Sequence, residues 1–218
     1  MLSIKKILKN LYESHRIGVT TSKTLLWLYV KKDLPKIKGK LGVDLAGGNM
    51  NTKRFFSTEK YISVDINQNK LDEGKKNNPD AVAINSKIQD YMKNYQDEKP
   101  ELLVCLQTFG INTIFQNEET LDVVKMMCNF LKPGGSMIFN AGEFSLNLNK
   151  FEQELTPYLK SKFKKVDRKF YGAWILYNKS ISGPYKLIFA YIMYVFPFLT
   201  KIFNIKQKHV YFCCKNKI

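Results

Sequence analysis

The sequence has few of the residues that build metal sites and disulfide frameworks. It contains four cysteines and two histidines in 218 residues, and no two cysteines form a CxxC pair. Neither a zinc site nor a set of disulfides is therefore expected, and we interpret the cysteines as reduced, mostly buried thiols. The amino terminus is basic but lacks a long apolar stretch and a small-residue cleavage site, which argues against a secretory signal. We expect a cytoplasmic protein.

Arginine is also scarce, although the formal net charge is +16. Only three of the 35 basic residues are arginines, whereas base readout and bidentate phosphate recognition favour the guanidinium group. The lysine excess therefore favours a solvated surface that reflects genome composition over a nucleic-acid interface. Attraction to anionic membrane lipid or to an anionic substrate is the alternative.

No internal repeat and no glycine-, serine- or proline-rich linker divides the chain, so a single domain spanning residues 1–218 is expected. From Leu41 onward, apolar strand-like runs alternate with helical patterns, which predicts a mainly parallel sheet with helices on both faces. The expected strands are residues 41–45, 61–65, 81–84, 102–106, 136–140, 165–170 and 209–214. The expected helices are residues 2–12, 24–30, 68–77, 86–95, 118–131 and 149–162.

Two stretches in the first half have the layout of a nucleotide-type pocket. The strand at 41–45 runs into the adjacent glycines Gly47 and Gly48, and the strand at 61–65 ends on Asp65. Glycine lets the backbone approach a ligand, and an acid at this position accepts hydrogen bonds from ribose hydroxyls. Much further on, the sequence KPGG (residues 132–135) follows an expected helix and precedes an apolar strand.

In this order and at these distances, the motifs resemble those of class I S-adenosylmethionine-dependent methyltransferases, over residues 41–140. The family's first motif is roughly an acid, an apolar residue and Gly-x-Gly-x-Gly. This chain has DLAGGNM from Asp44, with Ala46 and Met50 in place of the outer glycines. The resemblance implies a Rossmann-like three-layer α/β sandwich whose seven-stranded sheet is mostly parallel with an antiparallel last strand, and it implies S-adenosylmethionine as the cofactor.

The resemblance also implies roles for individual residues. The backbone of residues 46–48 would pass under the methionine moiety, and Asp44 would meet its ammonium group directly or through water. Asp65 would bind the ribose 2′ and 3′ hydroxyls, although a turn or helix cap is the alternative for this acid. The complete expected cofactor set is Asp44, Ala46, Gly47, Gly48, Asp65, Ile66, Asn85, Ser86, Ile88, Leu106, Gln107 and Thr108.

The later members of this set have their own expected contacts. Ile66 would lie against the adenine or ribose, and Ile88 would cover the adenine ring. Asn85 stands where the family often has an aspartate, and its amide oxygen can accept the same hydrogen bond from the adenine amino group. Capping of the next helix is the alternative for Asn85 and Ser86. Leu106, Gln107 and Thr108 would face the methyl-transfer site.

Methyl transfer requires few fixed residues, because the sulfonium already makes the methyl group electrophilic. Candidates for a general base by position are Tyr12, His15, Glu143 and Tyr171. An Asn/Asp-Pro-Pro-Tyr/Phe motif is absent after the fourth strand, which disfavours a nucleobase amine as acceptor. We expect a small-molecule acceptor, with O-methylation of a sugar, glycan or lipid-like precursor in view by analogy. The alternatives are a nucleic-acid methyltransferase or nucleic-acid-binding protein, and a catalytically silent Rossmann-like adaptor.

A hydrophobic insertion distinguishes the carboxyl-terminal part. We divide the domain into a helical cap (1–40), a core (41–170), an insertion (171–208) and a final strand (209–218). The insertion carries fourteen uncharged residues between Lys186 and Lys201, which is too short for a membrane span of about 20 residues. Three interpretations stay open: a buried helix or lid, a segment in the interface of an anionic membrane at its inner face, and a dimer interface.

Overall fold

The computed structural model describes residues 24–111, 115, 117–173 and 183–218, and the expected helix at 2–12 lies outside them. The chain divides into two compact units. We call residues 33–169 with 210–218 the sheet unit, and residues 1–32 with 170–209 the helical unit.

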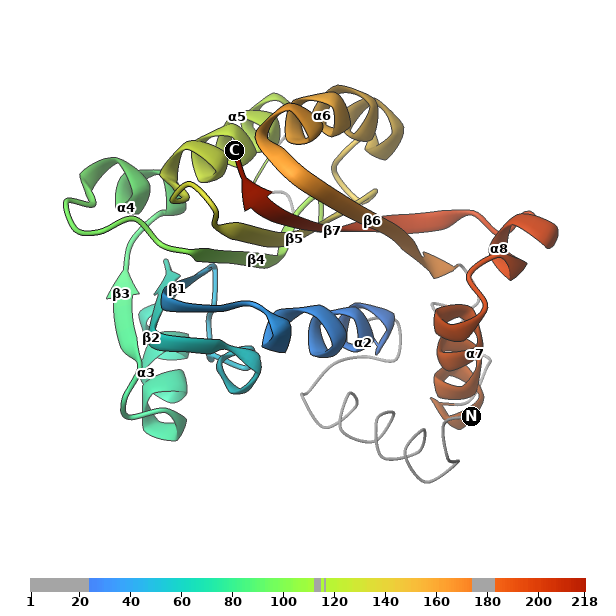
Figure 1. Ribbon diagram of the computed structural model, residues 1–218. Helices are drawn as coiled ribbons and strands as arrows, with labels where there is room; N and C mark the ends of the chain where they lie inside the picture. Colours follow the sequence, from blue (N-terminus) through green and yellow to red (C-terminus); the bar gives the residue numbers. More distant parts are fainter. Residues whose placement is uncertain (1–23, 112–114, 116, 174–182) are drawn as a thin grey trace. The chain divides into compact units, whose positions relative to one another are not determined.

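Seven strands form one sheet with the order β3-β2-β1-β4-β5-β7-β6, which confirms the expected fold class (Figure 1). β7 is antiparallel, and β6 lies beside it at the sheet edge. The strands are β1 (Lys38–Leu45), β2 (Ser57–Asp65), β3 (Val82–Asn85), β4 (Leu102–Phe109), β5 (Ser136–Gly142), β6 (Phe163–Ala173) and β7 (Gln207–Lys217).

Helices cover both faces of this sheet. In Figure 1, α4, α5 and α6 lie on one side of it and α3 lies on the other. The amphipathic pattern of α5 explains its position: Val124, Met127 and Cys128 recur at helical spacing and are fully buried. The helices of the sheet unit are α3 (Gln68–Asn77), α4 (Ile88–Asn94), α5 (Asn117–Phe130) and α6 (Leu148–Lys162), and a 3-10 turn η3 (Lys53–Phe55) links β1 to β2.

The parallel pairing brings four strand ends to one edge of the sheet. Leu45 of β1 pairs with Val64 of β2 and with Cys105 of β4, and Asp65 pairs with Asn85 of β3. The segments that follow β1, β2, β3 and β4 therefore meet at this edge, which we call the carboxyl edge. Ligands of open α/β sheets bind at such an edge.

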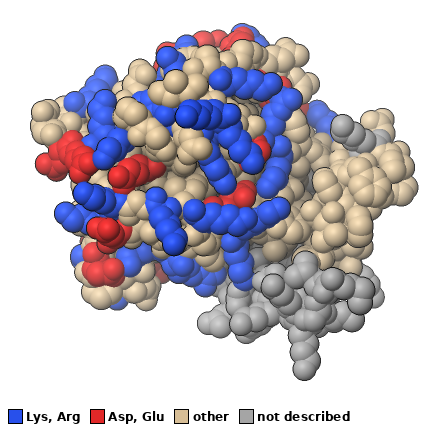
Figure 2. Space-filling view, in the orientation of Figure 1, with Lys and Arg blue, Asp and Glu red and all other residues tan. Residues whose placement is uncertain are grey.

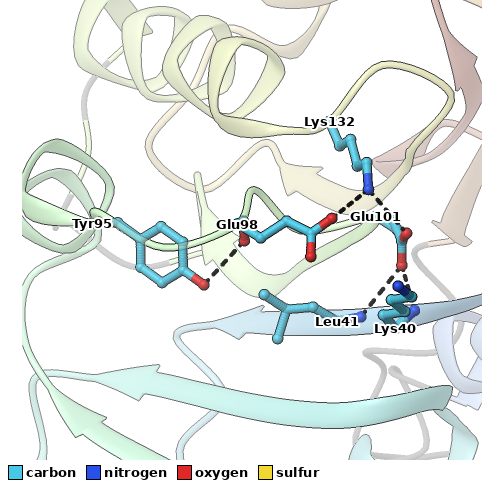
Figure 3. Close-up of polar contacts among 6 residues, drawn as sticks. All are labelled: Lys40, Leu41, Tyr95, Glu98, Glu101 and Lys132. Atoms are coloured by element: carbon cyan, nitrogen blue, oxygen red, sulfur yellow. Dashed lines mark hydrogen bonds and ion pairs between the residues drawn. The ribbon is translucent and has the colours of Figure 1, made fainter.

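The opposite, amino edge is held by a polar cluster around Glu101 (Figure 3). The Glu101 carboxylate accepts hydrogen bonds from the backbone N–H groups of Lys40 and Leu41, and Lys132 Nζ lies 3.5 Å from it. Lys132 also forms an ion pair with Glu98 at 2.6 Å. Lys132 begins the KPGG turn, which connects α5 to β5 as expected, with Gly134 at φ +77°. The KPGG motif thus acts structurally, at the edge away from the glycine turn.

The helical unit contains α7 (Gly183–Val195), α8 (Leu199–Ile202) and all but the last residue of α2 (Thr24–Asp33). α2 packs on α7 through aromatic side chains: the rings of Tyr29 and Tyr194 lie 5.3 Å apart, and Leu28 packs with Tyr191. Across the described ranges, no helix is long and apolar enough to cross a membrane.

Candidate functional site

The turn after β1 keeps a glycine-like backbone at three alternating positions. Ala46, Gly48 and Met50 have φ angles of +59°, +48° and +58°, respectively. Left-handed backbone is adopted readily by glycine and at a cost by other residues. The turn therefore has left-handed backbone at Ala46 and Met50, the two residues that stand in place of glycines.

Gly47 is fixed by close packing under the same turn. Its N–H donates to the carbonyl of Val64 on β2 at 3.1 Å. A Cβ at this position would collide with the Ser63 hydroxyl and would lie 2.9 Å from Cγ of Asp44. Beside it, a Cβ at Gly48 would find no atom nearer than 3.5 Å. The absence of a side chain at Gly47 thus allows the turn to pack against β2, and the space next to Gly48 is open.

Asp65 connects the end of β2 to this turn. Its Oδ2 accepts the backbone N–H of Gly48 at 2.9 Å, and its Oδ1 accepts the backbone N–H of Asn67 at 2.9 Å. The second bond belongs to the local turn, because Asn67 caps α3 by accepting the N–H of Lys70 at 3.1 Å. A carboxylate accepts about four hydrogen bonds. Asp65 therefore keeps the capacity to accept two ribose hydroxyls.

Asp44 is buried and already engaged. Its Oδ2 accepts the hydroxyl of Tyr61 at 2.9 Å and the hydroxyl of Thr52, and the side chain is 2% exposed. Burial raises the pKa of Asp44 to about 6, against the lowering effect of these hydrogen bonds. Thr52 and Tyr61 were not among the expected site residues. The role of Asp44 toward an ammonium group stays a prediction.

The end of β3 lies beside Asp65. Nδ2 of Asn85 donates to the Asp65 carbonyl at 3.0 Å, and the Ser86 N–H donates to the same carbonyl at 3.1 Å. The N-cap of α4 is Lys87, which makes no side-chain capping bond. The capping alternative for Asn85 and Ser86 is therefore not realised. The hydrogen bond from Nδ2 to the Asp65 carbonyl fixes the orientation of the Asn85 carboxamide, and with it the position of the amide oxygen.

Two isoleucines of the expected set have opposite environments. Ile66, directly after Asp65, is 62% exposed, whereas Ile88 is buried in the main core cluster. A cavity of about 1130 Å³ is lined by Asn85 and Ser86 at one end and by Lys40 and Glu98 near the amino edge, and neither isoleucine is part of its lining. Ile66 thus offers an apolar surface at the carboxyl edge.

At the end of β4 the pairing with β5 shifts between Cys105 and Phe109. Within the shift, Gln107 has φ +60°, and its N–H donates to Oδ1 of the fully buried Asn140 at 2.8 Å. Thr108 is buried and donates to the Leu106 carbonyl at 3.2 Å, and Leu106 is itself 8% exposed. Such bulges redirect side chains next to active sites. Asn140 was missed by the sequence reasoning, although a polar residue that ends an apolar strand is a readable signal.

The expected bases differ in position. Glu143 follows β5 at the carboxyl edge and is partly exposed. Tyr171 belongs to the helical unit, where it is buried and its ring stacks on His209 at 5.1 Å. Tyr12 and His15 lie outside the described residues. Among the residues with described positions, no three His, Cys, Asp or Glu side chains lie close enough together to bind a metal ion.

The strand order, the antiparallel β7 and the parallel carboxyl edge define the class I S-adenosylmethionine-dependent methyltransferase fold. The plantazolicin methyltransferase BamL, solved with a triazolic desmethylPZN analog and SAH, is similar over 98% of this chain and 91% of its own, with 14% identity and a TM-score of 0.55. The N-methyltransferase NodS from Bradyrhizobium japonicum WM9 is similar over 89% of this chain and 93% of its own, with 11% identity and a TM-score of 0.55.

A protein from Clostridium thermocellum described as an rRNA-methylase is similar over 87% of this chain and 94% of its own, with 15% identity and a TM-score of 0.52. No protein-family profile matches the sequence, and no curated protein matches it. At identities this low, the likeness establishes the fold.

Proposed function

We propose that this protein is an S-adenosylmethionine-dependent methyltransferase with a small-molecule acceptor. The observation that carries the proposal is the hydrogen bond between the Gly48 N–H and the Asp65 carboxylate. It holds a left-handed glycine turn and a carboxylate with spare acceptor capacity at one sheet edge. The methyltransferase fold and the SAH in the similar BamL structure support this assignment.

The residues at the carboxyl edge suit the separate parts of the cofactor. When bound, S-adenosylmethionine supplies an electrophilic methyl group on a sulfonium. The backbone at Ala46 and Gly48 would accommodate the methionine part, and Asp65 would accept the ribose hydroxyls. Asn85 would accept the adenine amino group through its amide oxygen. Ile66 would exclude water on the adenosine side.

Gln107 and Glu143 would face the acceptor. Asn140 holds the backbone N–H of Gln107 at the end of β4. The carboxamide of Gln107 can donate a hydrogen bond to the methyl acceptor or accept one from it. Glu143 is the expected base that lies at the carboxyl edge, and it would take a proton from an acceptor hydroxyl or amine. A sugar, glycan or lipid-like hydroxyl stays the proposed acceptor. The likeness to NodS, an N-methyltransferase, makes an amine the other acceptor to test.

Two other functions have specific support. The likeness to a protein described as an rRNA-methylase favours a nucleic-acid substrate, which predicts affinity that falls steeply as salt rises. The replacement of two motif glycines favours a silent adaptor, which predicts no cofactor binding. An anionic membrane surface, reached through residues 186–201, is the proposed partner in addition to the acceptor.

Titration calorimetry with S-adenosylhomocysteine tests the proposal. We expect the wild-type chain to bind, and we expect Asp65→Ala to weaken binding by at least about 30-fold, because two hydrogen bonds to a charged group are lost. Asp72→Ala is the matched control, since Asp72 is exposed on α3 and bonds to Gln68. Absence of binding by the wild type, or equal binding by Asp65→Ala, would overturn the assignment.

A further inference from the structure

From residue 187 to its end at Val195, α7 carries no charged side chain. One face is buried, with Ala190, Tyr191 and Met193 at most 9% exposed, and Tyr191 packs with Leu28 of α2. The other face is open: Ile188, Ile192 and Val195, spaced as i, i+4 and i+7, are each at least 40% exposed. A helix that is apolar all round normally lies in a protein core or in lipid. The outer face of α7 is therefore exposed although its side chains are apolar.

The exposed apolar surface continues beyond the end of α7. Four more large side chains are 47% to 67% exposed between residues 196 and 203. We call these seven residues the apolar stripe: Ile188, Ile192, Val195, Phe196, Phe198, Ile202 and Phe203. In Figure 2, the surface over α8 is tan, the colour of uncharged residues, whereas many lysines and acids lie on the visible surface of the sheet unit. Contiguous apolar patches of this kind mark interaction surfaces.

The charged residues of the helical unit are almost all basic. Its 72 residues include twelve lysines and arginines and a single acid, Glu13, whereas the 146 residues of the sheet unit include 23 basic and 18 acidic residues. No acid follows Asp167 in the chain. The basic residues are about equally frequent in both units, so the units differ in charge because the helical unit has almost no acids.

We infer that the apolar stripe is a docking surface for the interface of an anionic lipid bilayer. Aromatic and branched side chains would enter the boundary between headgroups and acyl chains, while the exposed Lys206 and Lys208, which follow the stripe in the chain, would meet anionic headgroups. A second copy of this chain fits less well, because two strongly basic units would repel each other. This inference is independent of methyl transfer.

Vesicle flotation of the full chain tests the inference. Vesicles of phosphatidylcholine are compared with vesicles that also contain about 30 mol% phosphatidylglycerol. We expect the chain to float with the anionic vesicles, with at least about tenfold stronger partitioning than to the neutral ones, and we expect salt to weaken this binding. Failure to float with anionic vesicles would overturn the inference.

Two kinds of variant separate the apolar and the charged contributions. Ile192→Ser combined with Phe198→Ser should weaken flotation at least about tenfold, whereas Phe144→Ser, which replaces an exposed phenylalanine of the sheet unit, should not. Lys206→Glu with Lys208→Glu should weaken binding to anionic vesicles. The matched control is Lys36→Glu with Lys38→Glu in the sheet unit, which should leave that binding unchanged.

Calorimetry with S-adenosylhomocysteine on the same variants keeps this inference separate from the proposed function. We expect unchanged cofactor binding in every vesicle-binding variant, which also shows that each variant is folded. Equal flotation of the serine double variant and the wild type would overturn the inference. So would light scattering that shows a dimer dissociated by the serine substitutions in a chain that does not bind vesicles.

Discussion

The backbone N–H of Gly48 donates to Oδ2 of Asp65 across 2.9 Å, which joins the turn after β1 to the last residue of β2. The two residues are seventeen positions apart in the sequence. Parallel pairing of β1 and β2 places both at the carboxyl edge. The same carboxylate that orders the turn thus has oxygen lone pairs left for a ligand above it.

Asp65→Asn should have an intermediate effect on the proposed site. The amide keeps one oxygen that accepts hydrogen bonds but loses the negative charge and the second acceptor. We expect S-adenosylhomocysteine affinity to fall by roughly tenfold, about 1.4 kcal/mol, which is less than for Asp65→Ala. Calorimetry on the three proteins gives the ranking, and an asparagine variant that binds as well as the wild type would contradict a role for the carboxylate.

Ala46→Gly should stabilise the fold. Ala46 has φ +59°, and left-handed backbone costs a residue with a Cβ about 1–2 kcal/mol, which exceeds the extra unfolded-state entropy of glycine. We expect the free energy of unfolding in urea to rise by up to about 1 kcal/mol. A lower midpoint for this variant would show that the alanine methyl makes contacts that outweigh the backbone cost.

Met50→Gly should have the opposite effect, although Met50 has the same backbone conformation. The Met50 side chain is 2% exposed and packs with Tyr61, Leu71 and Ala81. Removal of a buried methionine side chain costs about 2–5 kcal/mol. Urea denaturation of the two glycine variants in parallel therefore separates backbone strain from packing, and a stabilised Met50→Gly would contradict this account.

Asp44→Asn should change the pH dependence of stability. The folded chain holds the Asp44 proton more tightly than the unfolded chain, because burial raises the pKa to about 6 from the ordinary 3.8. The contribution of the Asp44 carboxyl to the free energy of unfolding is therefore largest below pH 4, and it is lost as pH rises through 6. An amide keeps an acceptor for Thr52 and Tyr61 without the buried charge.

At pH 7.5 the asparagine variant should be more stable than the wild type by about 1–3 kcal/mol, and the two should converge near pH 4. Denaturation curves between pH 4 and 8 measure the difference. A variant that is less stable at every pH would mean that the ionised carboxylate is required for the network.

Glu101→Gln should weaken the amino edge without affecting the cofactor site. The pKa of Glu101 is lowered, mainly by the hydrogen bond from the Lys40 backbone. Its stabilising effect is therefore present above the ordinary carboxyl pKa and is lost as pH falls through the lower folded value. We expect a loss of about 1–2 kcal/mol at pH 7. Glu98→Gln, at an exposed ion pair with the same Lys132, should change stability little.

The strands and helices of the sheet unit could be predicted because their signals are local. β4 and β5 are almost continuous apolar runs, and α3 spans the expected residues 68–77 behind the cap Asn67. The position of Asp65 at the end of β2 could be predicted in the same way, because the apolar run before it ends there.

Contacts that depend on register could not be predicted. Tyr61 reaches Asp44 because β2 pairs in parallel with β1, and Thr52 reaches it from the segment that joins the two strands. Asn140 reaches Gln107 where the β4–β5 pairing shifts. The backbone of Ala46 and Met50 was equally hidden, because a sequence with alanine and methionine gives no sign of left-handed φ angles. The exposure of the apolar stripe also required the structure, since a buried helix has the same composition.

A crystal structure of the chain with S-adenosylhomocysteine is the most direct test of the proposed site. We expect both ribose hydroxyls within hydrogen-bond distance of the Asp65 carboxylate, the backbone of Ala46 to Gly48 in contact with the amino-acid part, and the sulfur facing Gln107. A ligand bound elsewhere, or a carboxylate at Asp65 that turns away from the ribose, would contradict this expectation.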